Sequence, residues 1–251
     1  MALSRNFRTT YYKTLGVPVV QHIVDVEASF AAILSERAVN VPQLLKVALE
    51  LGIAPPYRAR SWLLLAGILP PYPGLWSFVL MERRAMFEDV VEAAQVLHEK
   101  DVMGSDEGNG VYYNFTELLE EMDDVQNEEL SSVLNRKRLV HLHRIYWGEF
   151  AMCEAPLLRG MDDANYLLGV ARAVCDVLTD EAERFWVFTR LLELFNDGLE
   201  SVDPMVPLST LHDAQLADFE VVFLRTLDVK RRRQAADGST SSLHMRKSGH
   251  D

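Results

Sequence analysis

The chain has 251 residues, a formal net charge of −12, and 49% apolar residues, which predicts one domain with a substantial core. The acidity is uneven. Lys230–Asp251 holds six basic and two acidic residues, and the rest of the chain holds 19 basic and 35 acidic residues. So acidic a body repels phosphate, which argues against nucleic acid or an anionic membrane as a partner and favours a basic protein.

The two cysteines, Cys153 and Cys175, lie among apolar residues with no CxxC spacing, so we expect buried, reduced thiols. The first residues lead into polar and aromatic side chains rather than an apolar run, unlike a secretory signal. The longest apolar stretch, Trp62–Pro71, is too short to span a bilayer. These features predict a cytoplasmic protein with no transmembrane segment.

Helical periodicity begins in the N-terminal part. Apolar residues at three- and four-residue steps predict a helix over Val20–Ser35, although the β-branched patch Val17–Val26 leaves a strand as an alternative. Pro42 suits the first turn of a second helix, and Gly52 suits its end. A third helix is predicted over Tyr57–Leu69, where prolines follow.

A long amphipathic helix is predicted next, over about Leu75–Lys100, followed by a polar loop over Asp101–Gly110. The strongly acidic Thr116–Asn135 reads as a solvated helix face. Asp162-Asp163 is a good start signal for a further helix, because carboxylates accept the free backbone N–H groups there.

Thr179-Asp180-Glu181 predicts the start of another helix, which Asn196-Asp197-Gly198 ends. A last helix is predicted over about Ser209–Leu227. Residues 229–251 are basic, polar and rich in Ser and Gly, so we expect a disordered tail.

Signals for chemistry are weak throughout. The sequence has no glycine-rich phosphate loop, and no serine stands in a G-x-S-x-G setting. His141 and His143 lack a third ligand at helical spacing, so no metal is expected. The carboxylates at 120–121 and 123–124 are better explained by solvation than by acid–base catalysis. Lys230–Arg233 has three interpretations: a localisation signal, a contact for anionic lipid, or only a solubilising end of the chain.

Two segments carry a resemblance to a known family. Arg58-Ala59-Arg60-Ser61-Trp62-Leu63-Leu64-Leu65-Ala66-Gly67 is similar to the R-x-x-x-W-x-x-L-x-G motif that opens a TBC (Rab-GAP) domain. Asp180-Glu181-Ala182-Glu183-Arg184-Phe185-Trp186 resembles the entry to a central helix of that domain. Arg and Trp four residues apart share a helix face, and the glycine is expected to allow close approach before a turn. The residues that carry the motifs are Arg58, Trp62, Leu65, Gly67, Phe185 and Trp186.

The resemblance implies an all-α TBC helical domain over residues 4–228, incomplete at its C-terminal end because the family's final helices have no counterpart, and a basic disordered tail over 229–251. Active members use an arginine from I-x-x-D-x-x-R and a glutamine from Y-x-Q-G-M to speed GTP hydrolysis. Neither motif is present in this sequence. Asp162 stands where the glutamine would stand, and a carboxylate there repels a γ-phosphate.

Arg136, Arg138 and Arg144 lie in the region of the missing arginine, but nothing aligns them as catalytic fingers. We therefore expect no catalytic residue and no cofactor. The alternative is an active GTPase-activating protein for a Rab-family small GTPase that uses unrecognised fingers.

Arg5–Arg8, Tyr11-Tyr12 and Gly67–Pro71 are similar to the corresponding runs of a TBC protein that is a subunit of the tuberous sclerosis complex. This resemblance implies a scaffold that binds a hamartin-like coiled coil, supports regulation of the Rheb GTPase and restrains mTORC1 signalling. It also implies recruitment to vesicle or lysosome surfaces through partners.

Overall fold

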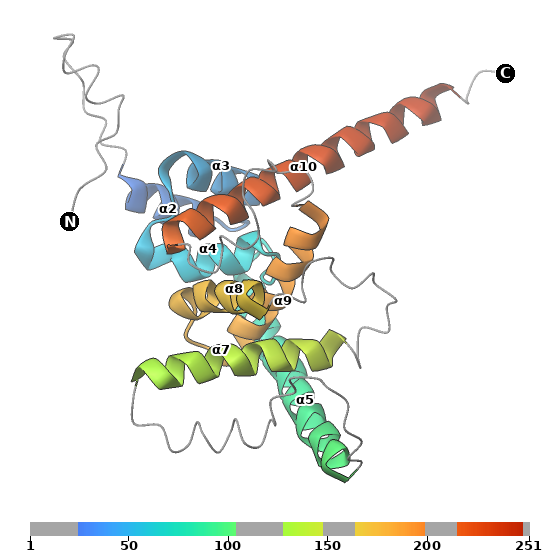
Figure 1. Ribbon diagram of the computed structural model, residues 1–251. Helices are drawn as coiled ribbons and strands as arrows, with labels where there is room; N and C mark the ends of the chain where they lie inside the picture. Colours follow the sequence, from blue (N-terminus) through green and yellow to red (C-terminus); the bar gives the residue numbers. More distant parts are fainter. Residues whose placement is uncertain (1–24, 104–127, 148–163, 199–214, 248–251) are drawn as a thin grey trace.

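The computed structural model describes residues 25–103, 128–147, 164–198 and 215–247 of the chain (Figure 1). Every regular element in these ranges is helical and no strand occurs there, which confirms the predicted all-α fold class. The elements are α2 (Val26–Leu34), α3 (Val41–Leu51), η1 (Pro55–Tyr57), α4 (Arg58–Leu65), η2 (Pro73–Leu75), α5 (Trp76–Met103), α7 (Glu128–Ile145), α8 (Ala164–Val177), α9 (Glu181–Gly198) and α10 (Leu216–Lys247).

Helix α9 lies at the centre of the fold, because it packs on α4, α5, α7, α8 and α10 (Figure 1). A helix in contact with neighbours on all sides must be apolar on all sides. The run Phe185–Phe188 is buried accordingly, as are Leu191, Leu192 and Phe195. The core therefore forms around α9.

The first helices begin where their capping residues stand. The carboxylate of Asp25 accepts the N–H of Ala28, so α2 begins at Val26, inside the range predicted to start at Val20. The side chain of Asn40 accepts the N–H of Gln43 and Pro42 occupies the first turn of α3, while Gly52 follows its last residue. Most of the alternative strand, and the rest of that predicted helix, lie outside the described residues.

Two predicted boundaries need correction. The third helix does not run over Tyr57–Leu69: Pro55–Tyr57 forms a short 3₁₀ turn and α4 ends at Leu65, since Gly67 turns the chain. Helix α5 continues to Met103, beyond the predicted start of a loop at Asp101.

Helix α7 is the element that the sequence indicated least well. The acidic face expected over Thr116–Asn135 overlaps only its first residues, and the rest of that segment lies outside the described residues. The polar and basic residues at 135–138 interrupt the apolar periodicity of this helix in the sequence. Leu139, Val140 and Leu142 nevertheless belong to the hydrophobic core, and Leu134 is also buried.

Helix α10 begins at Leu216 rather than Ser209, and it does not end at Leu227 but continues to Lys247 (Figure 1). The predicted boundary after Asp228 falls inside this helix, and the segment expected to be a disordered tail lies on it as far as Lys247. The physical reason is that Lys, Arg, Gln and Ala are good helix formers. An ion pair between Asp228 and Arg232, one turn apart, adds support. Beyond the packed body, α10 projects away from the other helices (Figure 1).

Across the residues with described positions, no helix combines the length and apolarity needed to cross a membrane.

Candidate functional site

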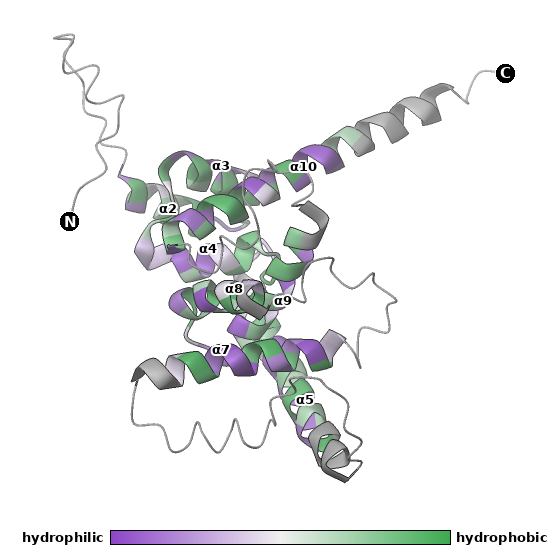
Figure 2. Cartoon of the chain, in the orientation of Figure 1, coloured by the Kyte–Doolittle hydropathy of each residue, from purple (hydrophilic) through white to green (hydrophobic). Residues whose placement is uncertain are grey.

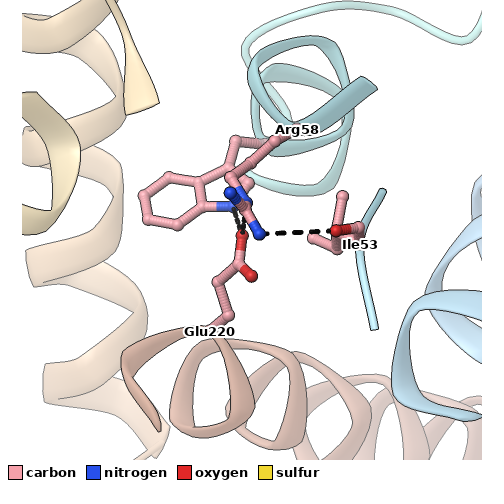
Figure 3. A network of polar contacts seen from close by, with 4 residues as sticks. Ile53, Arg58 and Glu220 are labelled. Carbon is pink, nitrogen blue, oxygen red and sulfur yellow. Dashed lines mark hydrogen bonds and ion pairs between the residues drawn. The ribbon is translucent and has the colours of Figure 1, made fainter. Parts of the chain in front are cut away.

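The residues of the first motif meet the last helix in a polar network inside the core. Glu220 Oε1 on α10 accepts a hydrogen bond from Arg58 Nε at 2.8 Å and another from Trp62 Nε1 at 2.9 Å (Figure 3). Arg58 Nη2 also donates to the carbonyl of Ile53 at 3.5 Å. Arg58 and Trp62 are four residues apart on α4, so both side chains reach the same carboxylate.

Burial makes this network consequential. Trp62 and Glu220 are buried and Arg58 is partly buried, so the carboxylate is largely removed from water. A buried charge is tolerated only when it is paired and hydrogen-bonded, and here both conditions hold. The Trp62 ring also stacks on Phe219 at 5.8 Å and contacts Phe223 at 5.4 Å, both on α10. The motif therefore joins α4 to the C-terminal helix.

The sequence did not identify Glu220 as a buried hydrogen-bond acceptor. It lies 158 residues from Trp62 in an acidic chain, and no local pattern distinguishes it from solvated glutamates. The available signal was its place between Phe219 and Phe223 on a face that is otherwise apolar.

Leu65 and Gly67 end the motif. Leu65 is buried, and Gly67 adopts a φ of +76°, which L side chains rarely adopt. The N–H groups of Ile68 and Leu69 return to the carbonyl of Leu63, a common way to close a helix on a left-handed residue. The expected reason for the glycine was wrong, because a Cβ atom there would meet nothing within 4 Å. The backbone conformation, not close packing, requires glycine.

The second motif performs a similar role at the other side of the core. Phe185 is buried against Phe87 of α5 and Tyr146, with ring centroids 5.4 and 5.6 Å away. Trp186 Nε1 donates to the carbonyl of Arg83 at 2.7 Å, and the Arg83 guanidinium lies over the indole ring. These contacts join α9 to α5.

The two motifs do not converge on one reactive centre. Arg58 and Trp62 contact α10, whereas Phe185 and Trp186 contact α5 and residues that follow α7. Between the motifs, Arg190 Nε of α9 donates to the carbonyl of Ala66 at 3.3 Å. Arg58, Trp62, Phe185 and Trp186 therefore hold helices together, and Leu65 and Gly67 lie where α4 ends.

The three arginines considered as fingers lie on α7. Arg136 turns back on its own helix, where Nε and Nη2 donate to the carbonyl and hydroxyl oxygens of Ser132 at 3.0 and 2.9 Å. Arg138 Nη1 pairs with Glu181 Oε1 at 2.7 Å, and Arg144 is exposed. Asp162, at the position of the missing glutamine, lies outside the described residues.

A charged groove of about 460 Å³ lies between α5, α7 and the start of α9. Its two arginines, Arg84 and Arg138, pair with Asp180 and Glu181. Nearby Glu183 is half-buried, and burial, followed by the Asp180 charge, raises the pKa of its carboxyl group. The lining of the groove has two arginines and four carboxylates, so its net negative charge makes it poorly suited to a phosphate.

His143 of α7 is buried in the core, whereas His141 is partly exposed. His143 is buried, its Nδ1 lies 3.0 Å from the hydroxyl of Thr189, and its ring meets Phe188 edge-on. Burial, with a smaller contribution from the Arg144 charge, lowers the pKa of His143 to about 3. No group of three potential metal ligands occurs among the residues placed in the structure. His143 is therefore a neutral core residue at pH 7.

Several large apolar side chains on and just before α5 are open to solvent. The α5 face, as we call it, consists of Leu75, Phe78, Met81 and Met86, with Tyr72 beside it. Phe78 and Met81 are each 58% exposed. At about 100° per residue these positions occupy less than half of the helix circumference, while Phe87, Val90 and Ala94 face the core. Helix α5 thus buries one apolar side against the described helices and exposes a second set of apolar residues, among which Glu82 and Asp89 also lie.

The fold is all-α, and Arg58, Trp62, Phe185 and Trp186 of the two motifs that resemble a TBC domain pack helices against one another. No protein-family model matches the chain. Among curated proteins it is similar to TBC1 domain family member 7 of Bos taurus, at 21% identity over 203 residues, and of Homo sapiens, at 23% identity over 203 residues. Both matches cover 81% of this chain and 57% of the relative.

A protein of the same name from Xenopus tropicalis is 30% identical over 94 residues, which is 38% of this chain and 31% of that protein. These matches, at 21–30% sequence identity, confirm the resemblance to the TBC family. The chain spans under two thirds of the length of the curated relatives that it matches.

Proposed function

We propose that this chain is a non-catalytic TBC-type interaction module, a scaffold that binds and stabilises an amphipathic helix of a coiled-coil partner. The α5 face is the observation that carries the proposal. Monomeric proteins rarely expose contiguous large apolar side chains without a binding role. Its length from Leu75 to Met86 is about 16 Å at 1.5 Å per residue, which matches about three turns of a partner helix.

Charge specifies the partner further. Glu82, Glu88 and Asp89 are exposed on α5 among or beside the apolar residues. Carboxylates at the edge of a helix pair favour Lys or Arg at the facing positions. The partner helix is therefore apolar along one stripe with basic flanks, in keeping with the acidic body of this chain.

The similarity to TBC1 domain family member 7 supports a particular partner. We propose a hamartin-like coiled coil within a complex of the tuberous sclerosis type, through which the chain supports regulation of Rheb and restrains mTORC1 signalling. The chain acts in the cytoplasm and reaches vesicle or lysosome surfaces through this partner. It needs no cofactor, since its role is to hold a helix.

The test is co-purification of the chain with a hamartin-like coiled-coil fragment. We expect the wild type and Val221→Ser, which changes an exposed valine on α10, to bind alike. The double variant Phe78→Ser/Met81→Ser should weaken binding at least about tenfold, as expected when apolar anchors are removed. Equal binding by all three, or binding by none, would refute the proposal.

The competing function is GTPase activation. A single-turnover GTP hydrolysis assay against a panel of Rab proteins separates the two, because an arginine finger accelerates hydrolysis by about three to five powers of ten. We expect no acceleration. Acceleration that is lost in Arg138→Ala or Arg144→Ala would show an active enzyme instead.

A further inference from the structure

A second surface lies where α10 packs on α3, and its lining shares no residue with the α5 face. The two helices pack together and leave a groove of about 780 Å³ between them. Its apolar lining comes from α3, from Leu45, Val47 and the 38%-exposed Leu49. Its polar edge comes from Lys46 of α3 and from Arg231 and Arg232 of α10.

The charges at this edge are not all equivalent. Arg232 pairs with Asp228 one turn earlier, so much of its charge is locally balanced. Arg231 is exposed and makes only a long contact of 3.5 Å to the carbonyl of Pro42. Lys46 is also exposed, and Glu50 is the remaining acidic residue of the lining. The lining holds three basic and two acidic side chains, so the edge keeps a net charge of +1, and Lys46 and Arg231 are the basic residues outside the Asp228–Arg232 pair.

This positive edge stands out against the rest of the molecule. Outside Lys230–Asp251 the chain has 35 acidic and 19 basic residues, so an acidic ligand is repelled from most of its surface. The hydrophilic stretch of α10 where it leaves the body is visible in Figure 2. The groove is thus a place where an acidic partner meets both an apolar floor and complementary charge.

We propose that the α3–α10 groove is a docking site for an acidic amphipathic helix of a partner protein. Val47 and Leu49 receive the apolar stripe of this helix, and Lys46 and Arg231 pair with its Asp or Glu side chains. The charge is opposite to that expected for the partner of the α5 face, so the two surfaces select different ligands.

A protein helix fits these observations better than an anionic membrane does. The apolar residues lie in a hollow between two helices rather than on a projecting side, and a flat bilayer surface cannot enter such a hollow. The acidic body would also be repelled by anionic lipid. A helix about 10 Å across can lie along the junction and reach both walls.

The experiment uses the full chain and three fluorescein-labelled synthetic helices with the same leucine stripe, whose polar positions are Glu, Gln or Lys. Fluorescence anisotropy should show saturable binding of the Glu peptide, about tenfold or more tighter than the Lys peptide. Arg231→Glu should weaken the Glu peptide about tenfold, and higher salt should reduce the difference. Leu49→Ser should weaken all three peptides.

Matched controls keep the result specific. Arg172→Glu reverses an exposed charge on α8, and Val221→Ser changes an exposed apolar residue on α10 outside the groove, so both should bind the Glu peptide as the wild type does. No preference for the Glu peptide, or equal losses in Arg172→Glu and Arg231→Glu, would overturn the proposal. Phosphatidylserine vesicles form a further arm. Vesicle binding that depends on Arg231, in the absence of peptide binding, would assign the site to membranes and overturn the proposal as well.

Failure here is distinguishable from failure of the proposed function. The hamartin-like fragment is tested with variants at Phe78 and Met81, and the peptides are tested with variants at Arg231 and Leu49. Each binding activity can be lost without the other.

Discussion

Loss of the Glu220 carboxylate would leave two buried or partly buried hydrogen-bond donors without their acceptor. The carboxylate accepts from two donors that lie on α4, and neither donor has another acceptor of comparable quality within the described structure. Removing one partner of a buried, hydrogen-bonded pair leaves the other desolvated and unsatisfied, which costs more than the pair itself contributes.

Glu220→Ala should therefore reduce the free energy of unfolding by about 2–3 kcal/mol, an amount reduced from a fully buried pair because Arg58 is partly exposed. Glu220→Gln keeps a carbonyl oxygen for Trp62 and should lose less. Urea denaturation measures both values. Glu88→Gln, at an exposed position on α5, should change stability by under about 0.5 kcal/mol. A Glu220→Ala effect as small as that control would mean that the network does not stabilise the fold.

Gly67 provides a test of backbone conformation without a steric complication. Gly67→Ala places a Cβ in open space but on a residue with φ of +76°, so the expected loss is about 1–2 kcal/mol. Gly74→Ala is the matched control, since its Cβ also meets open space and its φ is not positive. The two melting temperatures should differ by several degrees, and equal values would show that the turn relaxes freely.

His143 should make stability depend on pH. Its pKa is about 3 in the folded state and 6.5 in the unfolded chain, so only the unfolded state binds a proton between these values. Stability should fall as the pH drops below 6.5, by about 1.4 kcal/mol per unit, or about 2 kcal/mol by pH 5. His143→Gln, whose amide can still meet Thr189, should flatten this slope in denaturation series at pH 5 to 8. Parallel slopes for the two proteins would contradict this account.

Among the elements, the best predicted were those with local signals at both ends. Pro42 and Gly52 indicated α3, and Asp180 indicated the start of α9, where its carboxylate accepts the N–H of Glu183 at 3.0 Å. Such caps act within one turn, so the sequence alone carries them. The α7 stripe and the long α10 lacked this kind of punctuation.

The parts that could not be predicted depend on contacts between distant residues. The Glu220 network joins positions more than 150 residues apart, and the α5 face becomes visible only when the opposite side of α5 is seen to be buried. The pattern of α5 reads as one broad apolar stripe in the sequence. Tertiary packing divides that stripe into a covered and an uncovered side.

The start of α9 can be tested as an element. Asp180→Ala removes both the cap and the ion pair with Arg84, whereas Asp180→Asn keeps a capping oxygen and removes only the pair. We expect a loss of about 1 kcal/mol for the alanine variant and a much smaller one for asparagine, since the pair is well exposed. Thermal melts measure the difference. Equal losses would assign the effect to the ion pair instead of the cap.

At the scale of the whole molecule, a closed core supports two open surfaces of different charge. Trp62, Phe185 and Trp186 of the two motifs belong to this core, and the α5 face and the α3–α10 groove are open to ligands. The separation matters because each surface is carried by a helix that α9 or α4 holds in place. Loss of the Glu220 network should consequently disturb the groove on α10 more than the α5 face.

The most direct test of the scaffold proposal is hydrogen–deuterium exchange of the chain with and without a hamartin-like coiled-coil fragment. Binding of the fragment should slow exchange in peptides that cover residues 76–86 of α5 and leave exchange in α7 and α8 unchanged. Protection confined to other helices, with α5 exchanging as in the free chain, would contradict the scaffold proposal.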